Sequence, residues 1–184
     1  MTKKIIASVL AVLAIAGTSF AGTAVSSKES KQCVTQDTSY FKDKELQLDL
    51  FYSFNDGVRG GDRYFNDRSG GGLGLNYFFT RYFGVGAEGN WFKGGPSNAV
   101  LHDVSGSLIA RLPLECCTLH VAPYLFVGGS EVWDGKETSL ANVGAGMEVR
   151  LTPRFGLFAD WRYGFTMGSS NNMDTTRAGV RFTF

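Results

Sequence analysis

The sequence predicts an all-β fold, an eight-stranded antiparallel up-and-down transmembrane β-barrel. Apolar and polar residues alternate with a period of two in eight segments, each about ten residues long, the length that a tilted strand needs to cross a bilayer. The connections between these segments are long and short in turn, as in barrels that cross a membrane. The last segment, RAGVRFTF, carries two phenylalanines on its apolar face.

The N-terminal part of the chain has the layout of a secretory signal peptide over residues 1–21. Two lysines precede an apolar run over residues 5–16, and small residues lead to an expected cleavage after Ala21. A permanent anchor is the alternative, but the run is shorter than the roughly 20 residues of a spanning helix. Residues 22–44 are polar and lack a period, so we expect a flexible periplasmic lead-in before a barrel over residues 45–184.

Composition excludes some classes of partner. Lys and Arg total 18 and Asp and Glu total 17, a formal net charge of +1, so no basic field favours nucleic acid. After the signal peptide no apolar run reaches the length of a spanning helix. If the chain crosses a membrane, strands in a closed barrel must do so, because lipid cannot satisfy free backbone groups.

The first four strands are predicted from alternation of large apolar residues with polar or small ones. In residues 45–54, ELQLDLFYSF, leucines and aromatic residues alternate with Gln, Asp and Ser. In residues 71–79, GGLGLNYFF, and 83–91, FGVGAEGNW, the opposite face is mainly glycine and asparagine. Residues 103–112, DVSGSLIARL, set Val, Leu and Ala against Ser and Arg.

The last four strands complete the predicted barrel. Residues 119–128, LHVAPYLFVG, are apolar on both faces, so the register of this strand is the least determined. Residues 141–150, ANVGAGMEVR, and 155–165, FGLFADWRYGF, alternate clearly, with charged residues on one face. In residues 177–184 the arginines lie on one face and the phenylalanines on the other.

The connections sort into two kinds. The long, polar ones are expected to be exterior loops, at residues 55–70, 93–102, 129–140 and 166–174. The short ones are expected to be periplasmic turns, at residues 80–81, 113–118 and 152–154. A soluble sandwich has no reason to sort its loops in this way, whereas a membrane barrel does.

The polar face carries mixed charges that suit a narrow lumen. The candidates for lumen ion pairs are Asp49, Glu88, Arg111, Glu148, Arg150, Asp160, Arg162, Arg177 and Arg181. Arginine presents a planar fork that a confined carboxylate accepts, and these segments contain no lysine. The alternative is a solvated outer face on a soluble, lipocalin-like barrel with its apolar face inward.

Aromatic residues gather near the segment ends on the apolar face, as in the girdles at the two membrane interfaces. They are Tyr52, Phe54, Tyr77, Phe79, Phe83, Trp91, Phe155, Tyr163, Phe165, Phe182 and Phe184. Phe184 is then expected at the periplasmic rim.

Taken together, the eight segments, the hairpin NYFFTRYFGVGAEGNWF and the final Phe resemble the small outer-membrane β-barrel proteins of the OmpA-like and OmpX-like kind. The resemblance covers residues 45–184 and implies an outer-membrane location, contact with outer-membrane lipid and no cofactor. It also implies that Phe182 and Phe184 form the signal read by the barrel assembly machinery. The sequence departs from larger OmpA-type proteins because no periplasmic peptidoglycan-binding domain is expected.

Two motifs suggest other chemistry. Gly84, Gly86 and Gly89 match G-x-G-x-x-G, but the residues that follow continue in strand period instead of opening a helix, so we expect no nucleotide site. His102, with Ser105 and Glu88, would be the candidate group for a lipid-hydrolysing barrel, although its spacing matches no known triad. We predict neither catalytic residues nor a metal site.

Cys33, Cys116 and Cys117 are an odd number of cysteines in an exported chain. Our hypothesis is that Cys33 pairs with one of the other two and clips the lead-in to the barrel; a vicinal or an intermolecular bond is the competing arrangement.

The function predicted from these features is that of an integral outer-membrane barrel with a side-chain-plugged lumen, a non-enzymatic structural or surface-interaction protein that contacts ligands through its exterior loops. The alternative is a narrow channel or a small apolar-solute transporter, because eight strands leave an interior just wide enough for side chains. A lipid-modifying enzyme is a third class.

Overall fold

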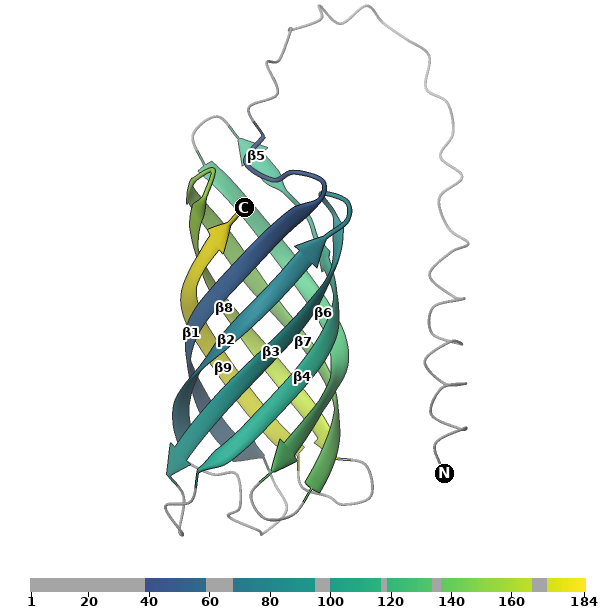
Figure 1. Cartoon of the computed structure of the whole chain (residues 1–184), viewed down its shortest axis with the longest axis vertical. Helices are drawn as coiled ribbons and strands as arrows, with labels where there is room; N and C mark the ends of the chain where they lie inside the picture. Colours follow the sequence, from purple (N-terminus) through teal and green to yellow (C-terminus); the bar gives the residue numbers. More distant parts are fainter. Residues whose placement is uncertain (1–38, 59–67, 95–99, 117–118, 134–136, 167–171) are drawn as a thin grey trace, which may run out of the picture. The chain divides into compact units, whose positions relative to one another are not determined.

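The structure is a computed structural model that describes residues 39–58, 68–94, 100–116, 119–133, 137–166 and 172–184 (Figure 1). Its strands are β1 (Glu45–Val58), β2 (Arg68–Phe78), β3 (Phe83–Gly94), β4 (Leu101–Arg111), β5 (Leu114–Cys116), β6 (Leu119–Trp133), β7 (Glu137–Thr152), β8 (Phe155–Thr166) and β9 (Asn172–Thr183). The described residues contain no helix long and apolar enough to cross a membrane.

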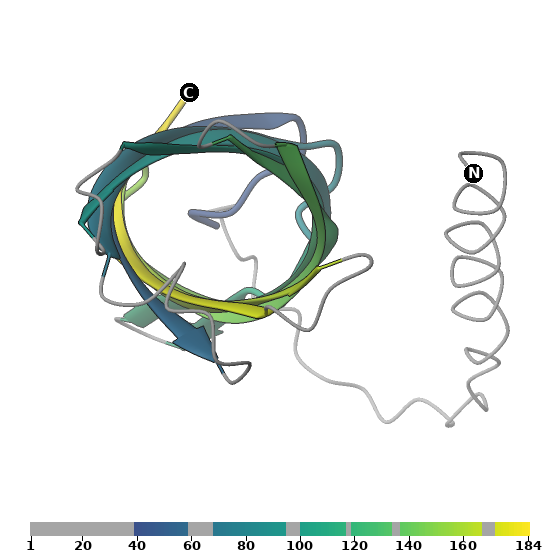
Figure 2. The ribbon, with the colours of Figure 1, turned by 90° about the horizontal axis from the view of Figure 1, so that it is seen from below.

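All of these strands belong to one antiparallel sheet that closes on itself. The order is β4-β3-β2-β1-β9-β8-β7-β6-β5, and a further pairing of β4 with β6 completes the ring. The short β5 pairs with β6 alone, so eight long strands form the wall. This confirms the predicted eight-stranded antiparallel up-and-down barrel. Figure 2 shows the barrel from one end, looking along its axis.

The strands are strongly tilted because the pairing is staggered. We followed paired residues from Asn55 on β1 to β9 and then through each remaining wall strand in turn. This path returns to β1 at Glu45, ten residues earlier in the chain. A stagger of this kind inclines strands to the barrel axis. It also brings inward residues that are far apart in sequence to the same height in the lumen.

The two faces of the wall are the reverse of those of a soluble barrel. Along β1, Gln47 is 0% exposed and Asp49 is buried, whereas Leu50 points outward. On β6, Leu125 is 64% exposed and the neighbouring Tyr124 is buried. The apolar face therefore points away from the lumen, which contradicts the lipocalin-like alternative.

Several strands are longer than the sequence predicts. The segments expected as loops at 55–70 and 129–140 contribute the end of β1 up to Val58, the end of β6 up to Trp133 and the start of β7 from Glu137. Antiparallel pairing satisfies backbone groups beyond the apolar band as well as within it, so loss of apolar alternation does not end a strand. For the same reason the expected turn at 113–118 contains β5.

The two ends of the barrel differ. At the short-turn end, uppermost in Figure 1, residues 79–82 join β2 to β3 and residues 153–154 join β7 to β8. The opposite end, called the loop end below, carries the other four connections, β1–β2, β3–β4, β6–β7 and β8–β9. Residues 39–44, expected to be part of a flexible lead-in, turn inside the ring of strands at the short-turn end (Figure 2). The predicted signal peptide and the rest of the lead-in lie outside the described residues.

Candidate functional site

The lumen is the part of the fold where charged residues gather. Near the short-turn end, Glu45, Asp49, Arg111, Glu148, Arg150 and Arg181 form the group called here the short-turn cluster. Oε1 of Glu45 accepts hydrogen bonds from Arg111 at 2.8 Å and from Arg150 at 2.6 Å. Because these residues lie on β1, β4 and β7, one carboxylate ties together three strands around the ring.

Arg181 continues the short-turn cluster toward the middle of the barrel. Its guanidinium donates two hydrogen bonds of 2.6 Å to the Asp49 carboxylate and one of 2.7 Å to Glu148. Asn76 donates to the same Asp49 carboxylate at 2.8 Å. Paired, hydrogen-bonded charges of this kind are tolerated in a buried place where isolated charges are not.

A second group, the middle cluster, consists of Glu88, Asp160, Arg162 and Arg177. Arg177 binds Asp160 through two hydrogen bonds of 2.7 Å and 2.9 Å, and it also pairs with Glu88. Glu88 pairs with Arg162 as well, and accepts a hydrogen bond from Ser105 at 2.7 Å. The negative charges of two carboxylates and the positive charges of two guanidiniums therefore balance each other in the middle cluster.

Aromatic rings fill the space around the guanidiniums. Arg111 lies 3.7 Å from the ring centroid of Phe78, Arg181 lies 4.6 Å from that of Phe158, and Arg177 lies 4.9 Å from that of Phe51. Such stacking of a cation on a ring is favourable. Space for one ring comes from Gly72, where an added Cβ would lie 2.6 Å from Phe51 Cζ.

The chain before β1 packs against the short-turn cluster. Phe41 is 1% exposed, and its ring lies 5.1 Å from the guanidinium of Arg111 and 4.8 Å from that of Arg150. The ring of Tyr40 stacks on His120 with centroids 3.6 Å apart. Arg150 also donates to the Tyr40 carbonyl at 3.1 Å, so the arginines of the short-turn cluster hold this segment in place.

Glu115 of β5 fixes the same segment from the rim. Its Oε1 accepts hydrogen bonds from the backbone N–H of Tyr40 at 2.8 Å and from the Ser39 hydroxyl at 2.9 Å. On the other side, Asp43 accepts a hydrogen bond from the Arg81 N–H at 2.5 Å. The short β5 thus provides a docking point for the chain that precedes the barrel.

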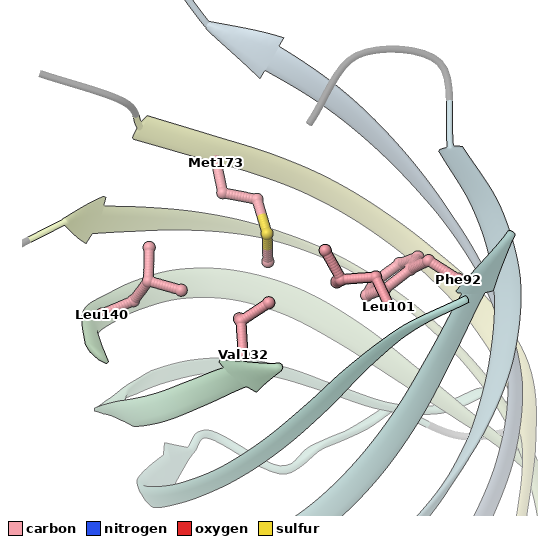
Figure 3. Packing of buried hydrophobic residues seen from close by; sticks show 5 residues of the cluster. All are labelled: Phe92, Leu101, Val132, Leu140 and Met173. Carbon is pink, nitrogen blue, oxygen red and sulfur yellow. The ribbon is translucent and has the colours of Figure 1, made fainter. Parts of the chain in front are cut away.

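At the loop end, apolar side chains gather inside the lumen. Five buried residues on five strands pack together inside the ring, and we call them the apolar cap: Phe92, Leu101, Val132, Leu140 and Met173 (Figure 3). Two residues away on the same strand, and deeper in the barrel, each of them has a buried polar residue as its neighbour on the inner face. This polar belt consists of Asn90, Asp103, Ser130, Asn142 and Thr175.

The structure places all nine predicted lumen residues on the inner face and in ion pairs. Asp49, Arg111, Glu148, Arg150 and Arg181 belong to the short-turn cluster, and Glu88, Asp160, Arg162 and Arg177 form the middle cluster. Sequence reasoning missed Glu45 as a partner, although its position shares the parity of Gln47 and Asp49. It also missed Phe41, for which no periodic signal exists.

The residues considered for a lipid-hydrolysing site do not lie together in the structure. His102 is exposed on the outer face of β4, whereas Ser105, three positions later, points into the lumen and donates to Glu88. An odd spacing on a strand puts two side chains on opposite faces, so this group cannot act as a catalytic unit. Gly84 and Gly86 lie within β3, with no helix after them, as expected from their strand period.

The cysteines and the final phenylalanines lie at the short-turn end where the structure describes them. Cys116 ends β5, while Cys33 and Cys117 lie outside the described residues. Phe182 contacts Phe155 with ring centroids 5.4 Å apart. Phe184 is 75% exposed, and its backbone exchanges two hydrogen bonds with Leu46.

Comparison of the structure with solved proteins identifies the architecture. It is similar to Neisserial surface protein A, with a TM-score of 0.57 and 18% sequence identity over 76% of this chain and 96% of that chain. This chain has the fold of the small outer-membrane β-barrels. The predicted resemblance to the OmpA-like and OmpX-like barrels is thereby confirmed at the level of the fold.

Two further barrels support the same conclusion. The N-terminal β-barrel domain of Pseudomonas aeruginosa OprF has a TM-score of 0.56 and 17% identity over 77% of this chain and 98% of that chain. The attachment invasion locus protein Ail of Yersinia pestis has a TM-score of 0.54 and 15% identity over 77% and 99%. No protein-family profile and no curated protein matches the sequence.

Proposed function

We propose that the chain is an integral outer-membrane protein with a structural or surface-interaction role, that it is not an enzyme, and that its lumen is closed to solutes. Its outward face supports a membrane location, because large apolar side chains such as Leu50, Tyr52 and Leu125 are exposed around the wall. In water such a surface would promote aggregation, whereas lipid accepts it. One of the similar solved structures is described as the outer membrane protein OprG of Pseudomonas aeruginosa, which supports the same location.

The observation that carries the proposal is the filling of the lumen along its length. From the loop end inward, the apolar cap, the polar belt, the middle cluster, the stacked rings, the short-turn cluster and Phe41 follow one another. A solute crossing the barrel would have to break both ion-pair clusters, leaving buried charges without partners. This arrangement favours a closed barrel over the narrow channel.

A protein with a closed lumen and a lipid-facing wall can offer its loops to the outside. The first exterior loop, predicted at 55–70, is the longest of the four, and most of it lies outside the described residues. Among the similar structures, one is described as a surface protein and another as an attachment invasion locus protein. We therefore assign contact with surface ligands to the loops, and to this loop first.

We also propose a role for the last strand in assembly, because this strand resembles the C-terminal signal of the small outer-membrane barrels. Phe182 and Phe184 would form the segment that the barrel assembly machinery reads, at the short-turn end and hence in the periplasm. Phe184 makes its described hydrogen bonds through its backbone and leaves its ring exposed, so the ring is available for recognition before insertion.

The test combines gel migration, conductance and adhesion on the full-length protein expressed with its own N-terminus. Unboiled protein from the outer-membrane fraction is expected to migrate faster than boiled protein, and the purified barrel is expected to add no stepwise conductance to a planar bilayer. Cells in which residues 59–67 are replaced by a Gly-Ser segment of equal length should attach less to cultured epithelial cells than cells with the same replacement at residues 134–136. Stepwise conductance would favour the channel, and turnover of membrane phospholipid by the purified barrel would favour the enzyme.

A further inference from the structure

One carboxylate in the lumen belongs to neither ion-pair cluster. Asp103, in the polar belt, is 3% exposed, and its Oδ1 has no hydrogen-bond partner. The nearest arginines of the middle cluster, Arg162 and Arg177, are already paired with Glu88 and Asp160. Because the two carboxylates and two guanidiniums of that cluster balance each other, Asp103 adds a further acidic group beside it.

Two further oxygen atoms near Asp103 are also buried without partners. Ser130 Oγ on β6 and Asn142 Oδ1 on β7 have no hydrogen bond, whereas Asn90, across the belt, is bonded to Ser53 at 2.9 Å. In the strand register, Asp103 pairs with Val132, two residues from Ser130, and Ser130 pairs with Leu140, two residues from Asn142. Diagonal neighbours on one face of a sheet lie about 7–8 Å apart, within reach of polar side chains around a shared ion.

The three oxygens are a chemically consistent set. A carboxylate, a hydroxyl and an amide oxygen are hard ligands, which suit hard cations. Leaving such oxygens dry and unbonded is unfavourable, and most of all for a charged group. A bound cation would supply the partner that each of these oxygen atoms lacks.

We propose that Asp103, Ser130 and Asn142 bind one monovalent cation, such as Na⁺, beneath the apolar cap. One carboxylate neutralises one positive charge, whereas a divalent ion would leave an excess charge in the buried lumen. Water molecules complete the coordination of the ion, and Asn142 contributes directly or through one of them. The apolar cap separates the site from the loop end, so the ion exchanges slowly and stabilises the closed barrel.

The experiment measures unfolding of the refolded full barrel by urea at constant ionic strength, with NaCl replaced stepwise by N-methyl-D-glucamine chloride. For the wild type, each tenfold rise in Na⁺ should multiply the ratio of folded to unfolded protein by up to about tenfold, the dependence for one bound ion. Asp103→Asn should abolish this dependence, and Ser130→Ala should shift it to higher Na⁺. Asn90→Ala, in the same belt, should retain it.

A direct measurement keeps the test independent of whether Asp103→Asn folds. Sodium retained after transfer to sodium-free buffer, counted by atomic emission, should be about one per wild-type chain and less in Ser130→Ala. A wild type that retains no sodium and unfolds independently of it would overturn the proposal and indicate a protonated Asp103 among water molecules. An equal response of Asp103→Asn, or a preference for Ca²⁺ over Na⁺, would overturn it as well.

Discussion

Arg181 and Asp49 face each other across the pairing of β9 with β1, and the guanidinium donates two parallel hydrogen bonds of 2.6 Å to the carboxylate. The same guanidinium reaches Glu148 on β7 at 2.7 Å. The first and last strands of the wall are thus tied together in the lumen as well as by their backbones. Part of the short-turn cluster therefore spans the seam between the first and last strands.

Replacement of Asp49 by Ala should therefore destabilise the barrel by about 3–5 kcal/mol, because it leaves a buried guanidinium with half of its partners. The measurement is the urea midpoint of the folded band in unboiled gel samples. The double variant Asp49→Leu with Arg181→Met should lose less than the single variant, since no unpaired charge remains. A double variant as unstable as the single one would show that packing matters here instead of charge.

Phe41→Ala should release the segment that closes the short-turn end. Loss of a buried Phe side chain costs about 3–5 kcal/mol, and part of that loss should appear as undocking of residues 39–44. Limited proteolysis followed by mass analysis should then find cleavage within this segment in the variant. Lys42→Ala, which changes an exposed side chain next to it, should give the wild-type pattern. Equal protection of both variants would contradict docking through the ring.

The apolar outer face of the wall, which we propose to contact lipid, should show an effect of charge that depends on depth. Leu125 lies in the middle of β6 and is 64% exposed, and Glu131 lies on the same outer face near the loop end. Leu125→Arg should cost about 2–4 kcal/mol in lipid vesicles, and Glu131→Arg about 0–1 kcal/mol, because the penalty falls toward the interface. Equal effects in vesicles would mean that this face does not contact the apolar part of a bilayer.

The disulfide hypothesis has a structural setting at β5. Ser39 and Tyr40 dock on Glu115, the residue before Cys116, and the six-residue step from Cys33 to Ser39 can span about 20 Å when extended. Mass mapping of non-reduced peptides should find Cys33 linked to Cys116 or Cys117. Complete alkylation of Cys33 without reduction would remove the hypothesis.

If Phe184 acts in assembly, its replacement should lower insertion into the membrane without lowering the stability of the folded barrel. Phe184 contributes backbone hydrogen bonds to Leu46, which an alanine can also make, and its ring is exposed. Phe184→Ala should therefore change the stability of the refolded protein by no more than about 0.5 kcal/mol. In cells it should lower the amount of heat-modifiable protein in the outer membrane. A large loss of stability in vitro would instead assign the ring a packing role.

Prediction from the sequence succeeded where the signal was local. The period of two identified each of the eight wall strands. It failed at strand ends. β6 extends as far as Trp133 and β7 begins already at Glu137, although apolar alternation is absent there. It also failed for residues 39–44, since their place in the barrel depends on Arg111, Arg150 and Glu115, which come much later in the chain.

The sequence by itself determined which residues share each face of the wall, and that one face would hold arginines and carboxylates together. The tertiary structure decided that this charged face points into the lumen, and which of its residues pair. Glu45 and Arg150 are 105 residues apart, yet a ten-residue stagger around eight strands brings them within 2.6 Å. Alternation is a property of each strand alone, whereas height in the lumen depends on the register of every strand pair around the ring.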